Sequence, residues 1–205
     1  MSQIKPIKHW SRVMIDTSVI VDYTKNPARF DKNPGEKDRI EKVQLLINYL
    51  TSPAHLGESP MLLVSAISIA ELSKLPESSS NIERVTSLFS GAEVTFVDFT
   101  ASIAASIPLL FDTILPDGQK FQWLKQLEQD LKFEGISWAR QWVSDDLKII
   151  ASAHAYRKKL DALISSDTKV FAQLATKLGL PLVQPSKIPT NPSGSIDVDV
   201  TFEGI

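Results

Sequence analysis

The sequence lacks cysteine and is poor in histidine and glycine, which excludes several kinds of site. Without cysteine there is no disulfide framework and no thiolate zinc site. The three histidines, His9, His55 and His154, are scattered, so any metal would need oxygen ligands. The eight glycines nowhere form a Gly-rich loop of the kind that cradles phosphates, which argues against a small-molecule phosphohydrolase.

Long hydrophobic runs are also missing. No apolar stretch approaches the roughly 18 residues of a membrane span. The first ten residues, M-S-Q-I-K-P-I-K-H-W, lack the apolar core and cleavage site of a secretory signal. We therefore expect a soluble, cytoplasmic protein with no membrane partner. With 205 residues, 43% of them hydrophobic, the chain is long enough for one sizeable core.

The charge balance is close to neutral. A formal net charge of -2 and a pI near 5.9 give no overall electrostatic footprint for nucleic acid, although a local patch matters more than the sum. The densest basic cluster is Arg157, Lys158 and Lys159. These residues fall where a helix is expected to end, and cations there interact favourably with the helix dipole. We favour that interpretation over a phosphate contact by about two to one.

Apolar runs alternate with helical periodicities along the chain and predict a parallel α/β sheet of about five strands flanked by helices. The expected strands lie at 13–15, 61–65, 94–97, 162–164 and 182–183. The expected helices lie at 19–24, 38–50, 66–75, 82–89, 101–111, 121–131, 145–159 and 170–178. Ser144 is the expected N-cap of the helix at 145–159, and Gly179 the expected C-terminal cap of the last helix.

Four acids occupy equivalent places in this pattern. Asp16 follows the first strand, Glu71 lies in the helix after the second, Asp146 starts the helix before the fourth, and Asp167 follows the fourth. The carboxyl ends of parallel strands meet at one edge of a sheet, where ligands bind, so these acids are expected to share a pocket.

Grouped carboxylates repel one another and tend to bind protons, so several of them stay ionised together only beside a cation. Mg²⁺ and Mn²⁺ prefer oxygen ligands and are the expected cofactors. Such an ion activates water and stabilises charge on a phosphodiester oxygen, which predicts hydrolysis of a nucleic-acid backbone.

Each acid also has a structural interpretation. Asp145 and Asp146 would complement a helix dipole, Asp167 would cap the following helix, Asp16 would bind nearby backbone amides, and Glu71 would pair with Lys74. Taken singly, each of these readings is as good as the catalytic one. A shared sheet edge favours the common site, because four independent coincidences would otherwise be needed.

The segments around the four acids resemble the motifs of the PIN-domain nucleases. V-M-I-D-T-S-V-I-V-D-Y resembles their opening motif, V-S-A-I-S-I-A-E-L the second, and D-L-K-I-I-A-S-A-H-A and L-I-S-S-D-T-K-V-F the third and fourth. The resemblance implies a metal-dependent ribonuclease with a Rossmann-like sheet and an RNA substrate. Many bacterial members are VapC-type toxins that a small antitoxin protein neutralises, so an antitoxin is an expected partner.

By position, the resemblance assigns catalytic and metal-binding roles to the quartet Asp16, Glu71, Asp146 and Asp167. Ser18 matches the hydroxyl or amide position beside the first acid, and Ser165 keeps a hydroxyl where threonine is commoner. Asp145 is a weaker candidate for the third acidic position than Asp146, because the spacing to Ile149, Ala151 and Ala153 favours Asp146.

The resemblance also suggests the domain organisation. Residues 1–184 are expected to form the PIN-like domain, with helical insertions at about 25–60 and 115–143 that are longer than a minimal toxin has. Residues 185–205 form a tail containing proline and glycine, in which Ile196, Val198, Val200 and Phe202 alternate with polar residues. That period predicts a strand that adds to a sheet edge in its own chain or a neighbour's; a disordered tail is the alternative.

The alternative function is a catalytically silent PIN-like module in which the insertions and the tail dock a protein partner. A homodimer is the base-rate expectation for a soluble oligomer.

Overall fold

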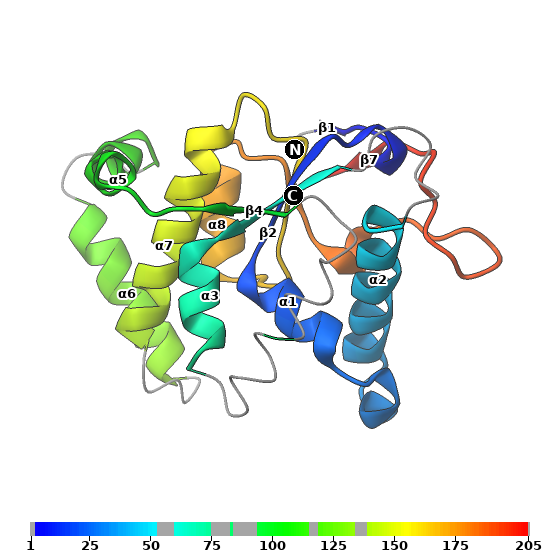
Figure 1. Ribbon diagram of the computed structural model, residues 1–205. Coiled ribbons are helices and arrows are strands. Elements are labelled where there is room, and N and C mark those ends of the chain that lie inside the picture. The colour runs from blue at the N-terminus through cyan, green and yellow to red at the C-terminus, as the bar shows by residue number, and fades with distance from the viewer. Residues whose placement is uncertain are drawn as a thin grey trace.

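A five-stranded parallel sheet lies at the centre of the computed structural model (Figure 1). Its strands are β2 (Arg12–Ile15), β3 (Met61–Ser65), β4 (Val94–Val97), β5 (Ala162–Ile164) and β6 (Leu182–Val183). Their order is β4-β3-β2-β5-β6, and every neighbouring pair is parallel. The structure describes residues 3–52, 60–74, 83, 94–114, 119–133 and 139–204. The predicted α/β class and the five predicted strands are confirmed.

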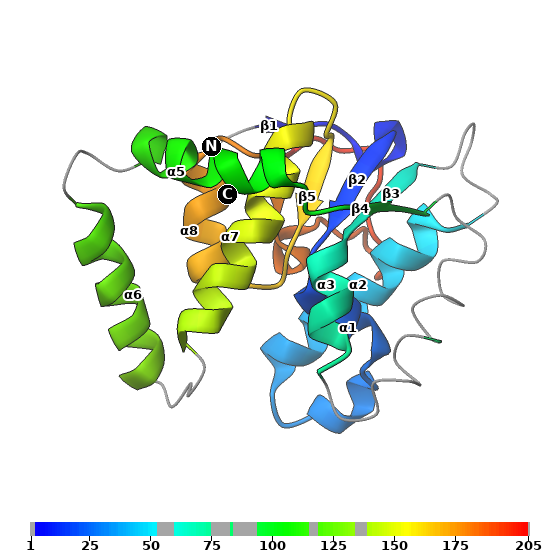
Figure 2. The same cartoon turned by 60° about the vertical axis from the view of Figure 1, so that its left-hand side comes forward.

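Helices connect the strands and flank the sheet (Figure 2). They are α1 (Thr17–Thr24), α2 (Pro34–Leu50), α3 (Ala66–Leu72), α5 (Ala101–Ile114), α6 (Lys120–Phe133), α7 (Ala139–Tyr156) and α8 (Val170–Lys177), with 3-10 turns η1 (Ile7–His9), η2 (Pro27–Phe30) and η3 (Pro185–Lys187). Gly179 follows α8 with φ of +63°, the left-handed conformation that a capping glycine adopts easily. The helix predicted at 82–89 and the expected packing of the Trp138 and Trp142 side chains lie outside the described part of the chain.

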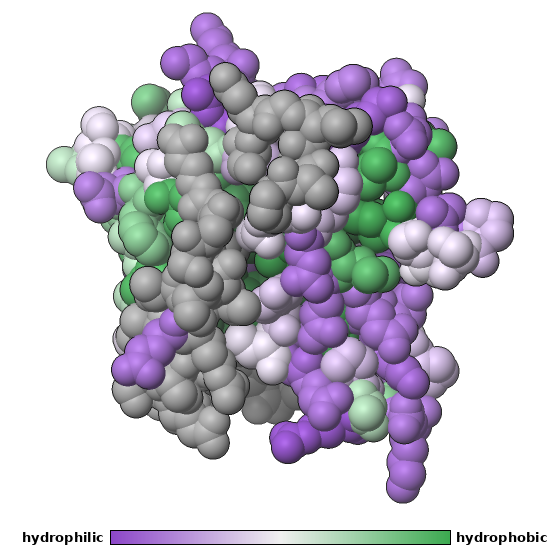
Figure 3. Space-filling model, turned by 45° about the vertical axis from the view of Figure 1, so that its right-hand side comes forward, coloured by the Kyte–Doolittle hydropathy of each residue, from purple (hydrophilic) through white to green (hydrophobic). Residues whose placement is uncertain are grey.

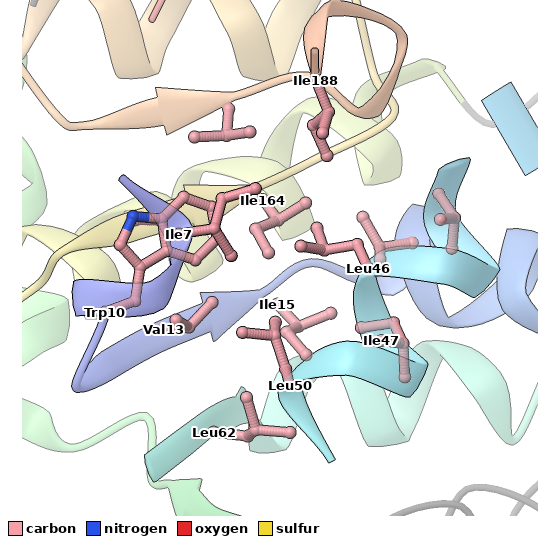
Figure 4. Packing of buried hydrophobic residues seen from close by; sticks show 14 of the residues in the cluster. Ile7, Trp10, Val13, Ile15, Leu46, Ile47, Leu50, Leu62, Ile164 and Ile188 are labelled. Carbon is pink, nitrogen blue, oxygen red and sulfur yellow. The ribbon is translucent and has the colours of Figure 1, made fainter. Parts of the chain in front are cut away.

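Two hydrophobic clusters cover the two faces of the sheet. Val13 and Ile15 of β2 belong to the cluster that includes α1 and α2, whereas Met14 belongs to the cluster that includes α7 and α8. Figure 4 shows Leu46 and Leu50 of α2 among the side chains around β2 and β5. Because successive strand residues point to opposite faces, a strand covered on both faces needs a continuous apolar run. That requirement explains the sequence of β2.

Helix α7 differs from the prediction. The sequence predicts a helix from residue 145 with Ser144 as its N-cap, but α7 begins at Ala139. Ala139, Arg140 and Gln141 are good helix formers, so helical propensity upstream of Ser144 outweighs the capping signal. Asp145 and Asp146 therefore lie inside the helix and not in its first turn. Their interpretation as residues that complement the N-terminal dipole is wrong.

The C-terminal tail also differs from the prediction. The alternating segment at 196–202 is not one continuous strand. Only β7 (Phe202–Glu203) is a strand, and it pairs antiparallel with β1 (Gln3–Ile4) in a separate two-stranded sheet. The alternation instead reflects packing: Ile196 is buried, and Val198 and Phe202 pack against the first core cluster. The division into a domain at 1–184 and a tail stays a prediction.

The surface is mixed in character. Most of the residues coloured in Figure 3 are hydrophilic, and hydrophobic ones gather in smaller areas at its left and upper right. None of the helices in the described ranges has the length and apolar character needed to cross a bilayer.

Candidate active site

The candidate site lies where the carboxyl ends of β2 and β5 meet. From β2 the chain passes to β3 on one side, while β5 lies on the other side of β2. The connections therefore leave in opposite directions at this junction, which is where open α/β sheets form a ligand crevice. Asp16 follows β2 directly, and Ser165 follows β5. A backbone hydrogen bond of 3.0 Å from the Asp16 amide to the Ile164 carbonyl oxygen fixes the two ends together.

Asp16 is only 4% exposed, and two serine hydroxyls orient it. Ser18 Oγ donates to Asp16 Oδ2 at 2.6 Å, and Ser165 Oγ donates to the same oxygen at 2.8 Å. The Ser18 amide also approaches Oδ2 at 3.4 Å, so Asp16 caps α1. Burial raises the pKa of Asp16, the hydrogen bonds from both serines oppose that rise, and Asp167 adds to it. Asp16 therefore does bind a nearby backbone amide, as its structural interpretation predicts. Its carboxyl nevertheless lies in an environment that disfavours ionisation.

Glu71 approaches the same junction from α3, which lies between α1 and α7 in both views (Figures 1 and 2). Thr17 Oγ1 donates a hydrogen bond to Glu71 Oε2 and so links the start of α1 to α3. Burial raises the pKa of Glu71 to about 7, and the charges of Asp16 and Asp145 contribute. Lys74 pairs with Asp145 and not with Glu71, so the ion pair suggested by sequence spacing is wrong.

Asp146 reaches the acids from α7. Burial of its carboxyl raises its pKa well above the ordinary value, and the charges of Asp16, Asp167, Glu71 and Asp145 raise it further. These long-range effects require the carboxyls to lie near one another, although their residues come from four segments of the chain. The structure thus brings the sequence-predicted quartet together at one sheet edge. Whether these acids bind a metal or act in catalysis stays a prediction.

Asp167 also caps the start of α8. Its Oδ1 accepts hydrogen bonds from the amides of Lys169, at 2.7 Å, and Phe171, at 3.2 Å, at the start of α8. The capping role that the sequence suggested therefore exists. Its charge nevertheless raises the pKa of both Asp16 and Asp146, so it also interacts with these two acids.

Two serines join the loops around Asp16. Ser18 Oγ accepts a hydrogen bond from the Ser166 amide at 2.9 Å, and Ser165 Oγ accepts one from the Asp167 amide at 3.1 Å. Each hydroxyl therefore donates to Asp16 and accepts from the loop after β5. This arrangement gives Ser18 and Ser165 a supporting role that fits their predicted positions.

Asp145 takes a different part from its neighbour. Its Oδ1 lies 2.8 Å from Lys148 Nζ, and its Oδ2 lies 3.5 Å from Lys74 Nζ. The sequence prediction preferred Asp146 as the third acid. Asp145 forms ion pairs with two lysines, and its charge also raises the pKa of Glu71 and Asp146. Sequence reasoning missed Thr17 and Lys74 as site residues. The D-T-S tripeptide was the available signal for Thr17, whereas the contact of Lys74 joins residues 71 positions apart and leaves no local signal.

The chemistry of these side chains fits a hard divalent cation. All are oxygen donors, and the raised pKa values of Asp16, Glu71 and Asp146 reflect the burial and repulsion that a cation would relieve. Within the described residues, no three Asp, Glu or His side chains are arranged as a ready-made metal site. Mg²⁺ is commonly held by one or two carboxylates together with waters and substrate phosphates, so a complete cage is not required.

Comparisons with known proteins leave the function open. No protein-family model matches the chain, and no curated protein matches it. Among solved structures, a similar chain occurs in the crystal structure of VapBC2 from Rickettsia felis bound to a DNA fragment from their promoter. The likeness covers 84% of this chain and 98% of that chain, with 16% sequence identity and a TM-score of 0.41. A likeness of this size does not decide what the chain does, so its function is inferred from its own residues.

Proposed function

We propose that the chain is a metal-dependent ribonuclease that hydrolyses RNA phosphodiester bonds with water as the nucleophile. One observation carries the proposal: the charge of Asp16 raises the pKa of Glu71, and the charges of Asp16 and Glu71 raise the pKa of Asp146, although the three residues come from separate segments. A fold that only needed stability would gain by replacing such mutually repelling buried acids. The parallel α/β sheet is consistent with the PIN-like fold that the sequence motifs predict.

A bound Mg²⁺ or Mn²⁺ would lower the pKa of a water molecule and stabilise the charge that develops on the phosphodiester. Asp16, Glu71 and Asp146 would hold it, with Asp167 assisting. Ser18 and Ser165 keep Asp16 Oδ2 fixed, and Thr17 keeps Glu71 Oε2 fixed, so two carboxylates are oriented before any ligand arrives. Such preorganisation of ligand side chains is what an effective cation site requires.

The test is Mn²⁺-dependent cleavage of single-stranded RNA by the wild type and by Asp16→Asn and Asp146→Asn. Asp199→Asn is the matched control, because Asp199 is an exposed acid paired with Lys8 away from the site. We expect the wild type and the control to cleave, and the two site variants to lose at least about a hundredfold of the rate, as loss of a principal electrostatic group does. Equal cleavage by all four proteins would show that the assignment of Asp16 and Asp146 to the catalytic site is wrong.

If the nuclease is a VapC-type toxin, as its motifs suggest, a small antitoxin is its partner. The second candidate is the silent module that docks a protein partner. The lack of a ready-made metal cage among the described residues is the observation that favours it. Folded protein that neither cleaves RNA nor gains thermal stability from Mn²⁺, and that binds a partner, would establish the module.

A further inference from the structure

Two lysines share one buried carboxylate beside the candidate site. The Asp145 side chain is 7% exposed and pairs with Lys148 of α7 at 2.8 Å and with Lys74, just after α3, at 3.5 Å. The two lysine side chains are 28% and 59% exposed. Lys74 and Lys148, here called the lysine pair, thus share one buried anion, Asp145, and both of them reach solvent.

The lysine pair lies against the acids of the candidate site. Lys74 follows Glu71 by three residues, and Asp145 directly precedes Asp146. The charge of Lys74 also opposes the rise in the pKa of Glu71. The two helices that carry Glu71 and Asp146 are therefore the same two that the lysine pair connects.

The carboxylate of Asp145 balances only one of the two positive charges of the lysine pair. Two ammonium groups and one carboxylate sum to one positive charge. The nearby cluster on α1 and α2 is different, because Lys25 and Arg39 there meet two acids, Asp22 and Glu36. The lysine pair thus provides local positive charge next to a group of acids that would otherwise repel a phosphate backbone.

We propose that Lys74 and Lys148, held in place by Asp145, bind a backbone phosphate of single-stranded RNA beside the bond to be cleaved. The choice of RNA rests on the proposed function. An ammonium group has three donors, and an exposed lysine in an ion pair still offers some of them to a ligand. A buried carboxylate that restrains both stems reduces the side-chain entropy that a free surface lysine loses on binding.

The proposal is distinct from a purely structural tie between α3 and α7, and salt dependence separates the two. Each phosphate contact to a single strand adds about 0.7 to the slope of log affinity against log salt concentration. A lysine that binds phosphate therefore changes this slope when it is removed. A lysine that only ties two helices together changes the melting temperature instead.

The experiment measures binding of a fluorescent single-stranded RNA oligonucleotide by anisotropy over a range of KCl concentrations. Full-length Asp16→Asn protein is used so that the RNA stays intact. Lys74→Gln and Lys148→Gln are made in this background. Lys177→Gln is the matched control, because Lys177 is an exposed lysine in the last turn of α8, at the other end of that helix from Asp167. Melting temperatures are recorded for every variant.

We expect Lys74→Gln and Lys148→Gln each to reduce the slope by about 0.7 and the affinity about fivefold at 0.1 M salt, while Lys177→Gln changes neither. An unchanged slope in both variants, an equal reduction in the control, or no binding of RNA overturns the proposal. Wild-type cleavage of RNA together with an unchanged slope in Lys74→Gln would reject this inference and support the proposed nuclease function. A reduced slope in Lys74→Gln without any RNA cleavage by the wild type would support the phosphate contact and reject the proposed nuclease.

Discussion

Ser165 Oγ donates a hydrogen bond of 2.8 Å to Asp16 Oδ2 across the junction of β5 and β2. The two residues are 149 positions apart in the chain, and each follows the end of a strand. The bond holds the first acid of the candidate site in one orientation, and its donor also anchors the Asp167 amide. The sheet edge and the site are therefore built from the same contacts.

This hydrogen bond predicts a specific loss when Ser165 is changed. A hydrogen bond to a charged group contributes about 1.5–3 kcal/mol, so Ser165→Ala is expected to weaken Mn²⁺ binding at least tenfold. Isothermal titration with MnCl₂ measures the affinity. Ser186→Ala is the control, because Ser186 is exposed on η3 and its hydroxyl makes no hydrogen bond to any of the four acids. Equal affinities in both variants would show that Asp16 does not need its serine donor.

Glu71 predicts a dependence of stability on pH in the absence of divalent cations. Its pKa is raised to about 7 in the folded state, so the folded chain holds this proton more tightly than the unfolded chain does. The resulting stabilisation is present at low pH and is lost as the pH rises through 7. Glu71→Gln removes the titration. The variant should be more stable than the wild type at pH 8, and its advantage should fall by about 2 kcal/mol on going to pH 5.

Urea unfolding in EDTA at the two pH values measures the effect of Glu71→Gln. The comparison with wild type cancels titrating groups that do not interact with Glu71, such as His154, whose pKa is lowered by burial. A stability difference that is the same at pH 5 and pH 8 would contradict the environment assigned to Glu71.

Asp22 predicts the opposite pH behaviour. Burial alone would raise the pKa of Asp22, but its bonds to Lys25, at 2.8 Å, and Arg39, at 2.9 Å, lower it overall. Its stabilisation is present above the ordinary pKa near 3.8 and is lost as the pH falls below that value. Asp22→Asn removes the buried carboxylate that Lys25 and Arg39 share and leaves them only their longer contacts to Glu36, at 3.5 and 3.4 Å. The loss of these two charge-assisted hydrogen bonds should cost about 3 kcal/mol at pH 7.

The control for Asp22→Asn is Asp31→Asn. Asp31 pairs with Lys37 at 2.7 Å, but its side chain is 66% exposed, and such surface pairs contribute about 0–1 kcal/mol. Urea unfolding at pH 7 and pH 3.5 compares the two. Similar small losses for both variants would mean that the Asp22 contacts between α1 and α2 do not stabilise the fold.

Adjacent acids on α7 are predicted to respond differently to substitution. Asp146→Asn should abolish the thermal stabilisation by Mn²⁺, because it removes a proposed ligand. Asp145→Asn should keep most of that stabilisation but lower the melting temperature without metal, because it breaks the contacts to Lys74 and Lys148. Differential scanning fluorimetry with and without MnCl₂ measures both. The assignment of roles is wrong if the two variants behave alike or exchange their behaviour.

The sequence was sufficient to predict the strands and the sheet edge near which the acids lie, because both depend on local patterns. Continuous apolar runs such as Val13 to Ile15 mark strands buried on both faces, and an acid directly after such a run must lie at the sheet edge. The pKa of Asp146 responds to the charges of the other three acids, although its helix was predicted to begin six residues too late. Helical periodicity relative to Ile149 and Ala153 sets the face of Asp146, and that phase does not depend on where the helix starts.

Features that depend on contacts between distant segments were not predictable. The ion pair of Lys74 with Asp145 and the hydrogen bond of Thr17 to Glu71 join residues on different helices, so no spacing in the sequence indicates them. The tail shows the same limit. Its alternation identifies Ile196, Val198 and Phe202 as residues that pack inward, whereas Val200 is exposed. A strand also needs continuous pairing: Phe202–Glu203 pairs with β1, and Ile196 forms only an isolated bridge with Thr190.

Direct measurement of Mn²⁺ binding by electron paramagnetic resonance tests the central claim that the acids at this sheet edge form a cation site. Free Mn²⁺ is titrated with the full-length wild type, with Asp16→Asn and with the control Asp199→Asn at pH 7.5. The wild type and the control should bind Mn²⁺ saturably, and Asp16→Asn should bind it at least about tenfold more weakly, since each lost charged ligand contact costs more than about 1.4 kcal/mol. Identical binding by wild type and Asp16→Asn, or no binding by either folded protein, would contradict the claim.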